Sequence, residues 1–253
     1  MKNIKYKTEN LVNYYSKTRK CWNEFYESER YMFDKVLSRF GASFSVLDVG
    51  CGCGGLGNAL LEKFPLNYYR GLDINEAEIN WAVEHNKLSV PYEFVCEDLA
   101  VYHDKNLFDV VISLSCVDYN IEVDKMIENA WNRVKPGGYF ILSIRLTTEE
   151  SINDIERAFQ YLNYDDENAQ EGEIANYVVF SLPDILKVFS GMNCVPDNIE
   201  AYGYWCKHSK TAVIEYDELC MSVFALHKPQ DCNIVNEEMK VQLELPRSFF
   251  AKM

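Results

Sequence analysis

The sequence predicts an α/β fold built on a doubly wound, mostly parallel sheet. Apolar, β-branched runs of strand length alternate with amphipathic segments of helix length between residues 44 and 145. Such alternation is typical of βαβ units, whose crossovers are right-handed. A glycine-rich turn also follows the first expected strand directly, and folds of this type bind ligands at the carboxyl ends of their strands. We therefore expect a ligand-binding protein of the doubly wound class.

The expected elements begin with a helical cap and continue as five strands. Apolar residues spaced three to four apart make residues 1–40 an N-terminal helical cap, which Gly41 ends. The main domain covers residues 41–228. Its first five strands are expected at 44–49, 68–73, 92–95, 108–114 and 139–144, with helices at 58–64, 76–88 and 122–134.

The second half of the chain departs from this alternation. An acidic insertion at about 146–180 follows strand five, and we expect a helix and a loop there. Its charges suit either a solvated face or a lid over a substrate. A helix at 182–189 and an antiparallel pair of strands at 198–205 and 220–227 then close the main domain. Residues 229–253 form a C-terminal tail with little signal.

Composition restricts the possible partners. The net charge is −14 and Lys and Arg form no cluster, which excludes nucleic acid and acidic membrane surfaces as partners. No run of about 18 apolar residues predicts a membrane span. The nine cysteines are an odd number without paired C-x-x-C motifs, which favours free thiols in the cytoplasm and no metal site. We expect a monomer or homodimer.

The glycine-rich turn supports two interpretations of its ligand. Gly50, Gly52 and Gly55 satisfy the dinucleotide pattern G-x-G-x-x-G, whereas Asp48 with Gly50, Gly52 and Gly54 satisfies D-x-G-x-G-x-G. A carboxylate at the strand end opposes a pyrophosphate but suits a ligand bearing a sulfonium and an ammonium. A turn without any ligand is the third possibility. This stretch resembles motif I of class I S-adenosylmethionine-dependent methyltransferases.

The resemblance implies a Rossmann-like methyltransferase fold with seven strands, the last one antiparallel. It also assigns cofactor contacts that follow successive strands. Asp73 would accept hydrogen bonds from the ribose hydroxyls and Ile74 would pack on the adenine, although Asp73 also suits a helix cap. Asp98 would accept from the adenine amino group beside Leu99, or belong to an ordinary polar loop. Ser115 follows strand four, and Tyr14 lies in the cap, which covers the cofactor in many relatives.

Candidates for catalysis and acceptor binding lie in later loops. Asp118 is a possible general base, with helix capping as its alternative. Tyr119 adjoins it and is a candidate for both catalysis and substrate binding. Arg145 ends strand five and could bind an anionic group or form a salt bridge. His208 and Trp205, at the last two strands, are the remaining catalytic and substrate-binding candidates.

These residues predict methyl transfer from S-adenosylmethionine to a small molecule. The chain resembles methyltransferases of bacterial surface-polysaccharide pathways, which implies an oxygen of a sugar, a nucleotide sugar or a capsular phosphoramidate precursor as the acceptor. The alternatives are an NAD-dependent oxidoreductase, which leaves Asp48 and Asp98 unexplained, and a non-catalytic cofactor-binding protein of the same fold.

Overall fold

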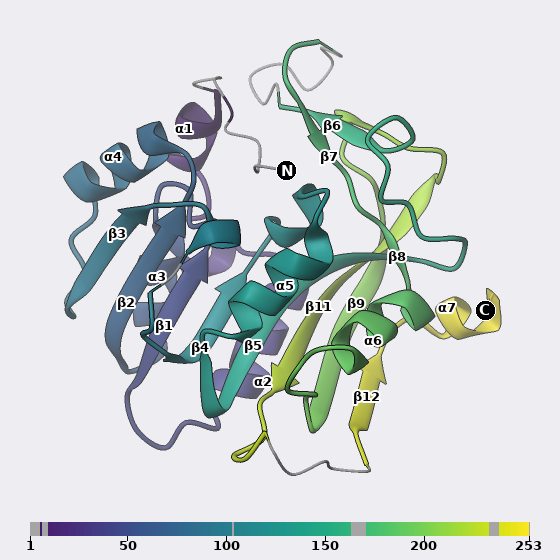
Figure 1. Cartoon of the computed structure of the whole chain (residues 1–253). Coiled ribbons are helices and arrows are strands. Elements are labelled where there is room, and N and C mark those ends of the chain that lie inside the picture. The colour runs from purple at the N-terminus through teal and green to yellow at the C-terminus, as the bar shows by residue number, and fades with distance from the viewer. Residues whose placement is uncertain (1–5, 7–9, 103, 163–170, 233–237, 253) are drawn as a thin grey trace.

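A large central sheet organises the molecule (Figure 1). The computed structural model describes residues 6, 10–102, 104–162, 171–232 and 238–252. Within them, eight strands follow the order β12-β9-β11-β5-β4-β1-β2-β3, and β8 pairs beside β5. The strands of this sheet are β1 (Phe44–Val49), β2 (Leu66–Asp73), β3 (Tyr92–Cys96), β4 (Phe108–Ser113), β5 (Val134–Thr147), β8 (Phe180–Ser181), β9 (Asn198–Lys207), β11 (Glu218–His227) and β12 (Lys240–Glu244).

The direction of the strands confirms the expected topology. Neighbouring strands from β3 to β5 are parallel, and β11 is antiparallel to both β5 and β9. The seven expected strands are present, and the described residues add two more to this sheet, β12 of the C-terminal tail beside β9 and the short β8 beside β5. The strand order reverses between β1 and β4, and a crevice opens at such a switch point outside the carboxyl ends of the strands.

Helices cover both faces of the sheet. They are α1 (Asn10–Tyr15), α2 (Glu27–Leu37), α3 (Gly55–Leu61), α4 (Glu76–His85), α5 (Val123–Trp131), α6 (Leu182–Ser190) and α7 (Arg247–Lys252). One core cluster joins α5, α6 and α7 to the sheet, and a second joins α2 and α3 to the opposite face. Successive β1 residues Val46 and Leu47 belong to different clusters, because alternate side chains point to opposite faces. A strand buried on both faces needs a continuous apolar run, which made β1 visible in the sequence.

The N-terminal helical cap is divided into short segments. Helix α1, the 3-10 turn Trp22–Glu24 and α2 occupy its described part. Helix α2 packs against the sheet, where Met32, Phe33 and Val36 are fully buried. The predicted helical character is therefore present, but α2 belongs to the core rather than to a separate cap.

The insertion after β5 differs from the expectation of a helix. Its described part forms β6 (Phe159–Tyr161) and β7 (Ile174–Asn176), which join β10 (Ala212–Val213) in a small antiparallel sheet. Strands of two or three residues carry too little periodicity to be recognised in a sequence. In Figure 1 this small sheet lies at the upper right of the molecule and α1 at the upper left, both above the central sheet. Part of the acidic stretch, residues 163–170, lies outside the described residues.

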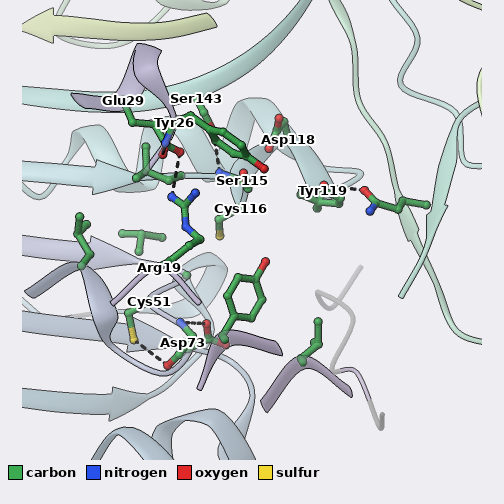
Figure 2. A pocket seen from close by; sticks show the side chains of 18 of the residues that line it. Arg19, Tyr26, Glu29, Cys51, Asp73, Ser115, Cys116, Asp118, Tyr119 and Ser143 are labelled. Atoms are coloured by element: carbon green, nitrogen blue, oxygen red, sulfur yellow. Dashed lines mark hydrogen bonds and ion pairs between the residues drawn. The ribbon is translucent and has the colours of Figure 1, made fainter. Parts of the chain in front are cut away.

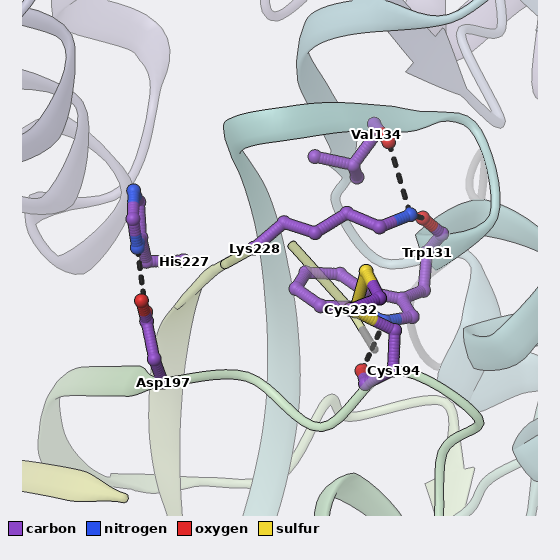
Figure 3. Close-up of a disulfide and its surroundings, with 7 residues drawn as sticks. All are labelled: Trp131, Val134, Cys194, Asp197, His227, Lys228 and Cys232. Carbon is purple, nitrogen blue, oxygen red and sulfur yellow. Dashed lines mark hydrogen bonds and ion pairs between the residues drawn. A yellow bond between two sulfur atoms is a disulfide. The ribbon is translucent and has the colours of Figure 1, made fainter. Parts of the chain in front are cut away.

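A disulfide links the C-terminal tail to the loop after α6. Cys194 and Cys232 are bonded across a sequence separation of 38 residues, which corrects the expectation of free thiols for this pair (Figure 3). The other seven cysteines are free. Beside the bond, buried Trp131 donates from Nε1 to the Cys194 carbonyl at 2.7 Å. Lys228 donates from Nζ to the carbonyls of Trp131 and Val134 at 3.0 Å each, and burial lowers its pKa to about 8.

The described helices do not meet the requirements of a membrane span. None of the described helices combines the length and the apolar composition that a bilayer crossing requires.

Candidate active site

A cavity of about 570 Å³ lies at the carboxyl ends of β1, β2, β4 and β5. This volume is within the range of sites for small molecules and cofactors. Its walls come from α1, the glycine-rich turn, the strand ends, the insertion and the loop after β9. The structure therefore brings the insertion and the sequence-predicted turn to one site.

The turn after β1 depends on its glycines. Gly50, Gly52 and Gly54 have φ values of 75°, 51° and 77°, where only glycine is unstrained. A Cβ on Gly50 would lie 2.5 Å from the Cys116 sulfur, so Gly50 is also required by packing. The Gly50 amide donates to the Leu72 carbonyl at 2.8 Å and ties the turn to β2. The backbone of the turn is thereby fixed in the cavity wall.

Asp73 links this turn to the next helix. Its Oδ2 accepts from the Gly52 amide and its Oδ1 from the Asn75 amide, both at 2.9 Å. Burial raises the pKa of the Asp73 carboxyl. Asp48 lies deeper, accepts from the Tyr69 hydroxyl at 2.6 Å, and has its pKa raised to about 7 by burial. Both carboxyls border the cavity beside the turn.

Glu78 is a third carboxyl that the sequence did not single out. It belongs to the first turn of α4, lines the cavity and is only 3% exposed. Burial and the neighbouring Asp73 raise the pKa of Glu78 to about 8. In the sequence Glu78 resembles an ordinary acid near a helix N-terminus, which is favoured there for other reasons.

The remaining predicted cofactor residues reach the same cavity. Ile74, Leu99 and Tyr14 line it. Asp98 also lines it, and its Oδ1 accepts from the Ala100 amide at 2.9 Å to start a short 3-10 turn, Leu99–Val101. Ser115 has a φ of 49°, and its amide donates to the Ser143 hydroxyl at 2.7 Å. In Figure 2 Cys116 lies between Asp73 and Asp118.

Asp118 and Arg145 form a buried ion pair in the cavity wall. Arg145 Nη1 lies 3.2 Å from Asp118 Oδ2 and donates to the carbonyls of Asp118 and Val178 at 3.1 and 3.2 Å. The guanidinium contacts the rings of Tyr119 and Tyr177, 4.1 and 3.6 Å from their centroids, and these two rings lie edge to face. Burial raises the pKa of Asp118 and the Arg145 charge opposes that rise. Asp118 Oδ1 is buried and accepts no hydrogen bond from the described residues.

Tyr119 connects this pair to the loop after β9. Its hydroxyl donates to Gln160 Oε1 at 2.7 Å, and Gln160 Nε2 donates to the hydroxyls of Ser209 and Thr211 at 3.1 and 3.0 Å. His208, in the same loop, lines the cavity with its Nδ1 2.8 Å from the Ser209 carbonyl oxygen. Gln160 comes from β6, so the sequence pattern offered no sign of it.

Two predicted site residues, Gly54 and Trp205, do not line the cavity. Gly54 packs against Phe94 and Asn86, whereas Trp205 faces α7. Trp205 Nε1 donates to the Ser248 hydroxyl at 2.8 Å, and its ring centroid lies 5.6 Å from that of Phe249. Alternate strand residues point to opposite faces, so Tyr204 and Cys206 line the cavity instead. The expected substrate contact of Trp205 is therefore corrected to a contact with α7.

Comparisons with known proteins identify a methyltransferase domain in the chain. Residues 47–140 match a family model described as a methyltransferase domain. The chain is 25% identical over 132 residues to malonyl-[acyl-carrier protein] O-methyltransferase 2 of Ilyobacter polytropus, covering 51% of each chain. It is 31% identical over 102 residues to ubiquinone biosynthesis O-methyltransferase of Coxiella burnetii, covering 39% of this chain and 42% of the relative. The chain thus spans about half the length, or less, of these curated relatives.

A solved structure shows the same fold. The 1,6-didemethyltoxoflavin-N1-methyltransferase of Burkholderia thailandensis, with bound 1,6-didemethyltoxoflavin and S-adenosylhomocysteine, has a TM-score of 0.56 and 15% identity over 87% of each chain. S-adenosylmethionine is the cofactor of this family. The matched residues contain the glycine-rich turn, Asp73 and Asp118. Residues 47–140 therefore match a methyltransferase domain, and the chain has the Rossmann-like fold of a methyltransferase solved with S-adenosylhomocysteine.

Proposed function

We propose that the protein transfers a methyl group from S-adenosylmethionine to a small-molecule acceptor. The observation that carries this proposal is the buried group of carboxyls around the glycine-rich turn, formed by Asp48, Asp73 and Glu78. In their ionised form, which a bound cation favours, these carboxyls attract the sulfonium and ammonium of this cofactor and oppose the pyrophosphate of NAD. The positive φ values of Gly50 and Gly52 let the backbone of the turn itself line the cavity.

The residues around the turn suit the separate parts of this cofactor. Asp73 would accept from the ribose hydroxyls, and Ile74 and Leu99 would pack on the adenine. Asp98 would accept from the adenine amino group, while Ser115 and Tyr14 would border the methionine part. When bound, the cofactor supplies an electrophilic methyl group on its sulfonium. The chain's own task is to hold an acceptor atom in line with that methyl group, and such orientation can contribute roughly 7–11 kcal/mol.

Asp118 is our candidate for the group that receives the acceptor's proton. Its Oδ1 is buried in the cavity wall without a described donor, which leaves it able to accept from a hydroxyl. A general base would add about 10²–10⁴-fold to the rate. Tyr119 and His208 are further candidates at the same end. Arg145 is already bound to Asp118 and two carbonyls, so we assign it to positioning Asp118 rather than to binding substrate.

For the acceptor, we propose an oxygen of a sugar, a nucleotide sugar or a capsular phosphoramidate precursor, methylated in the cytoplasm by a monomer or homodimer. Two curated relatives are named as O-methyltransferases, which supports oxygen as the accepting atom.

Binding and transfer can be tested separately. Calorimetry should detect S-adenosylhomocysteine but not NAD, and the reverse result would favour the oxidoreductase. Mass spectrometry of candidate acceptors incubated with methyl-labelled S-adenosylmethionine should then find a labelled product. Cofactor binding without transfer to any candidate acceptor would favour the non-catalytic alternative.

A further inference from the structure

The charged side chains of the cavity are separated by sign. Two of its cations are paired: Arg19 donates to Glu29 at 2.9 Å, and Arg145 pairs with Asp118. The other acids that line the cavity all belong to the turn, the ends of β1 and β2, α4 or the loop after β3: Asp48, Asp73, Glu78, Glu97 and Asp98. This end is the cofactor end of the cavity.

The opposite end is basic. The cavity is also lined by Lys207, the last residue of β9, and by Lys210 in the loop that follows, with His208 between them. Lys207 and Lys210 are exposed at the cavity wall and His208 is half-buried. Residues 207–210, which we call the basic loop, carry two lysines and no acid, whereas the chain as a whole has a net charge of −14. This short stretch is therefore a basic exception on an acidic protein.

A buried polar network holds this basic loop beside the proposed base. Gln160 is 3% exposed and binds both Ser209 and Thr211 through its amide nitrogen. Its amide oxygen accepts from Tyr119, the residue next to Asp118. A fully satisfied buried amide fixes the geometry of the segments it joins. The loop consequently faces the acceptor end of the cavity in a defined position.

We propose that the methyl acceptor is an anion that also carries a hydroxyl group. Its carboxylate or phosphate binds the basic loop through Lys207 and His208, and its hydroxyl faces Asp118 Oδ1. This inference rests on the proposed function, because it takes the acid-lined end as the cofactor site. Opposite charges at the two ends place the cationic cofactor and the anionic acceptor in one orientation only.

The test uses the full chain saturated with S-adenosylhomocysteine, whose binding is first established by calorimetry. The ring signals of His208, assigned by comparison with His208→Gln, are followed by NMR during titration with inorganic phosphate, glycerol 3-phosphate or glucuronate. Glycerol and glucose are the neutral counterparts. We expect saturable shifts with at least one anion and none with the neutral compounds. A response to the phosphates alone identifies a phosphate acceptor, and a response to glucuronate alone identifies a carboxylate.

A charge-reversal variant separates the basic loop from general electrostatics. Lys207→Glu should weaken the anion's affinity about tenfold or more, because an attraction becomes a repulsion. Lys187→Glu, an exposed position in α6 that does not line the cavity, makes the same change in net charge and should leave the affinity unchanged. Equal weakening in both variants, or no saturable shift with any anion, overturns the proposal. Failure of S-adenosylhomocysteine to bind would instead overturn the proposed function, and the anion titration can still be read on the unliganded protein.

Discussion

Replacing Arg145 with methionine should destabilise the protein more than almost any other single change in the cavity. Methionine keeps an apolar stem but removes the charge that faces Asp118. Asp118 is 2% exposed, and its Oδ1 already accepts no hydrogen bond from the described residues. Removing one partner of a buried ion pair typically costs about 3–5 kcal/mol, because the other charge remains buried without compensation. We expect a loss of this size in the free energy of unfolding.

The pH dependence of the loss follows from the same ion pair. Burial raises the pKa of Asp118 while Arg145 opposes the rise, so the pKa climbs further in Arg145→Met. The folded variant then retains a proton that the unfolded chain releases above about pH 4, the ordinary range of an aspartate. Its unfolding free energy should therefore fall as the pH rises from about 4, until the pH passes the folded-state pKa. The deficit relative to the parent should be larger at pH 7.5 than at pH 5.

Urea denaturation followed by circular dichroism measures this effect in a double-mutant cycle. Asp118→Asn removes the uncompensated charge, so Arg145→Met/Asp118→Asn should be more stable than Arg145→Met alone at pH 7.5. If the two variants have the same unfolding free energy within about 0.5 kcal/mol, the ion pair is not the source of the loss.

Three further predictions address the cofactor end. Asp73→Ala should weaken S-adenosylhomocysteine binding about 10–100-fold in calorimetry, because charged hydrogen bonds are lost. Asp118→Ala should keep this affinity and lower turnover about 10²–10⁴-fold. Equal affinity in Asp73→Ala and the parent contradicts the ribose assignment. Because burial raises the pKa of Glu78 from 4.5 to about 8, the folded protein binds a proton that the unfolded chain lacks, and stability falls as the pH rises between these values. Melting temperatures measured from pH 5 to 9 should fall less steeply in Glu78→Gln, and an unchanged slope would refute this. Gly54→Ala should lose at least about 1–2 kcal/mol of stability, since its φ is 77° and a Cβ would lie 2.7 Å from Phe94 Cζ. The matched control Gly41→Ala meets nothing within 4 Å and should lose none.

Much of the cofactor end could be predicted because its residues are tied to strand ends. Asp48 and Asp73 each end a buried strand, and parallel strands bring such ends to one edge of the sheet. Glu78 was not predicted, because an acid in the first turn of a helix has the same sequence pattern whether it faces a cavity or stabilises the helix terminus.

The acceptor end depends on contacts that no local pattern reveals. Arg145 is held by the Val178 carbonyl, and Gln160 by hydroxyls about fifty residues later in the chain. The sequence placed Trp205 on the wrong face of the sheet. The register of a strand decides which side chains point to each face, and a shift of one residue exchanges the two faces. The Cys194–Cys232 bond likewise requires two loops to be neighbours in space.

The small sheet of β6, β7 and β10 has a consequence for how such a protein can diversify. Its strands are drawn from two separate segments of the chain, and both lie outside the residues that build the glycine-rich turn. Insertions and substitutions in these segments can therefore alter the shape and charge of one cavity wall while the opposite wall keeps its geometry. The Asp118–Arg145 pair is where the two walls meet, since Arg145 also binds the carbonyl of Val178 beyond β7. Lineages that change their acceptor should accordingly vary at positions such as Lys207 and Gln160 well before they vary at this pair.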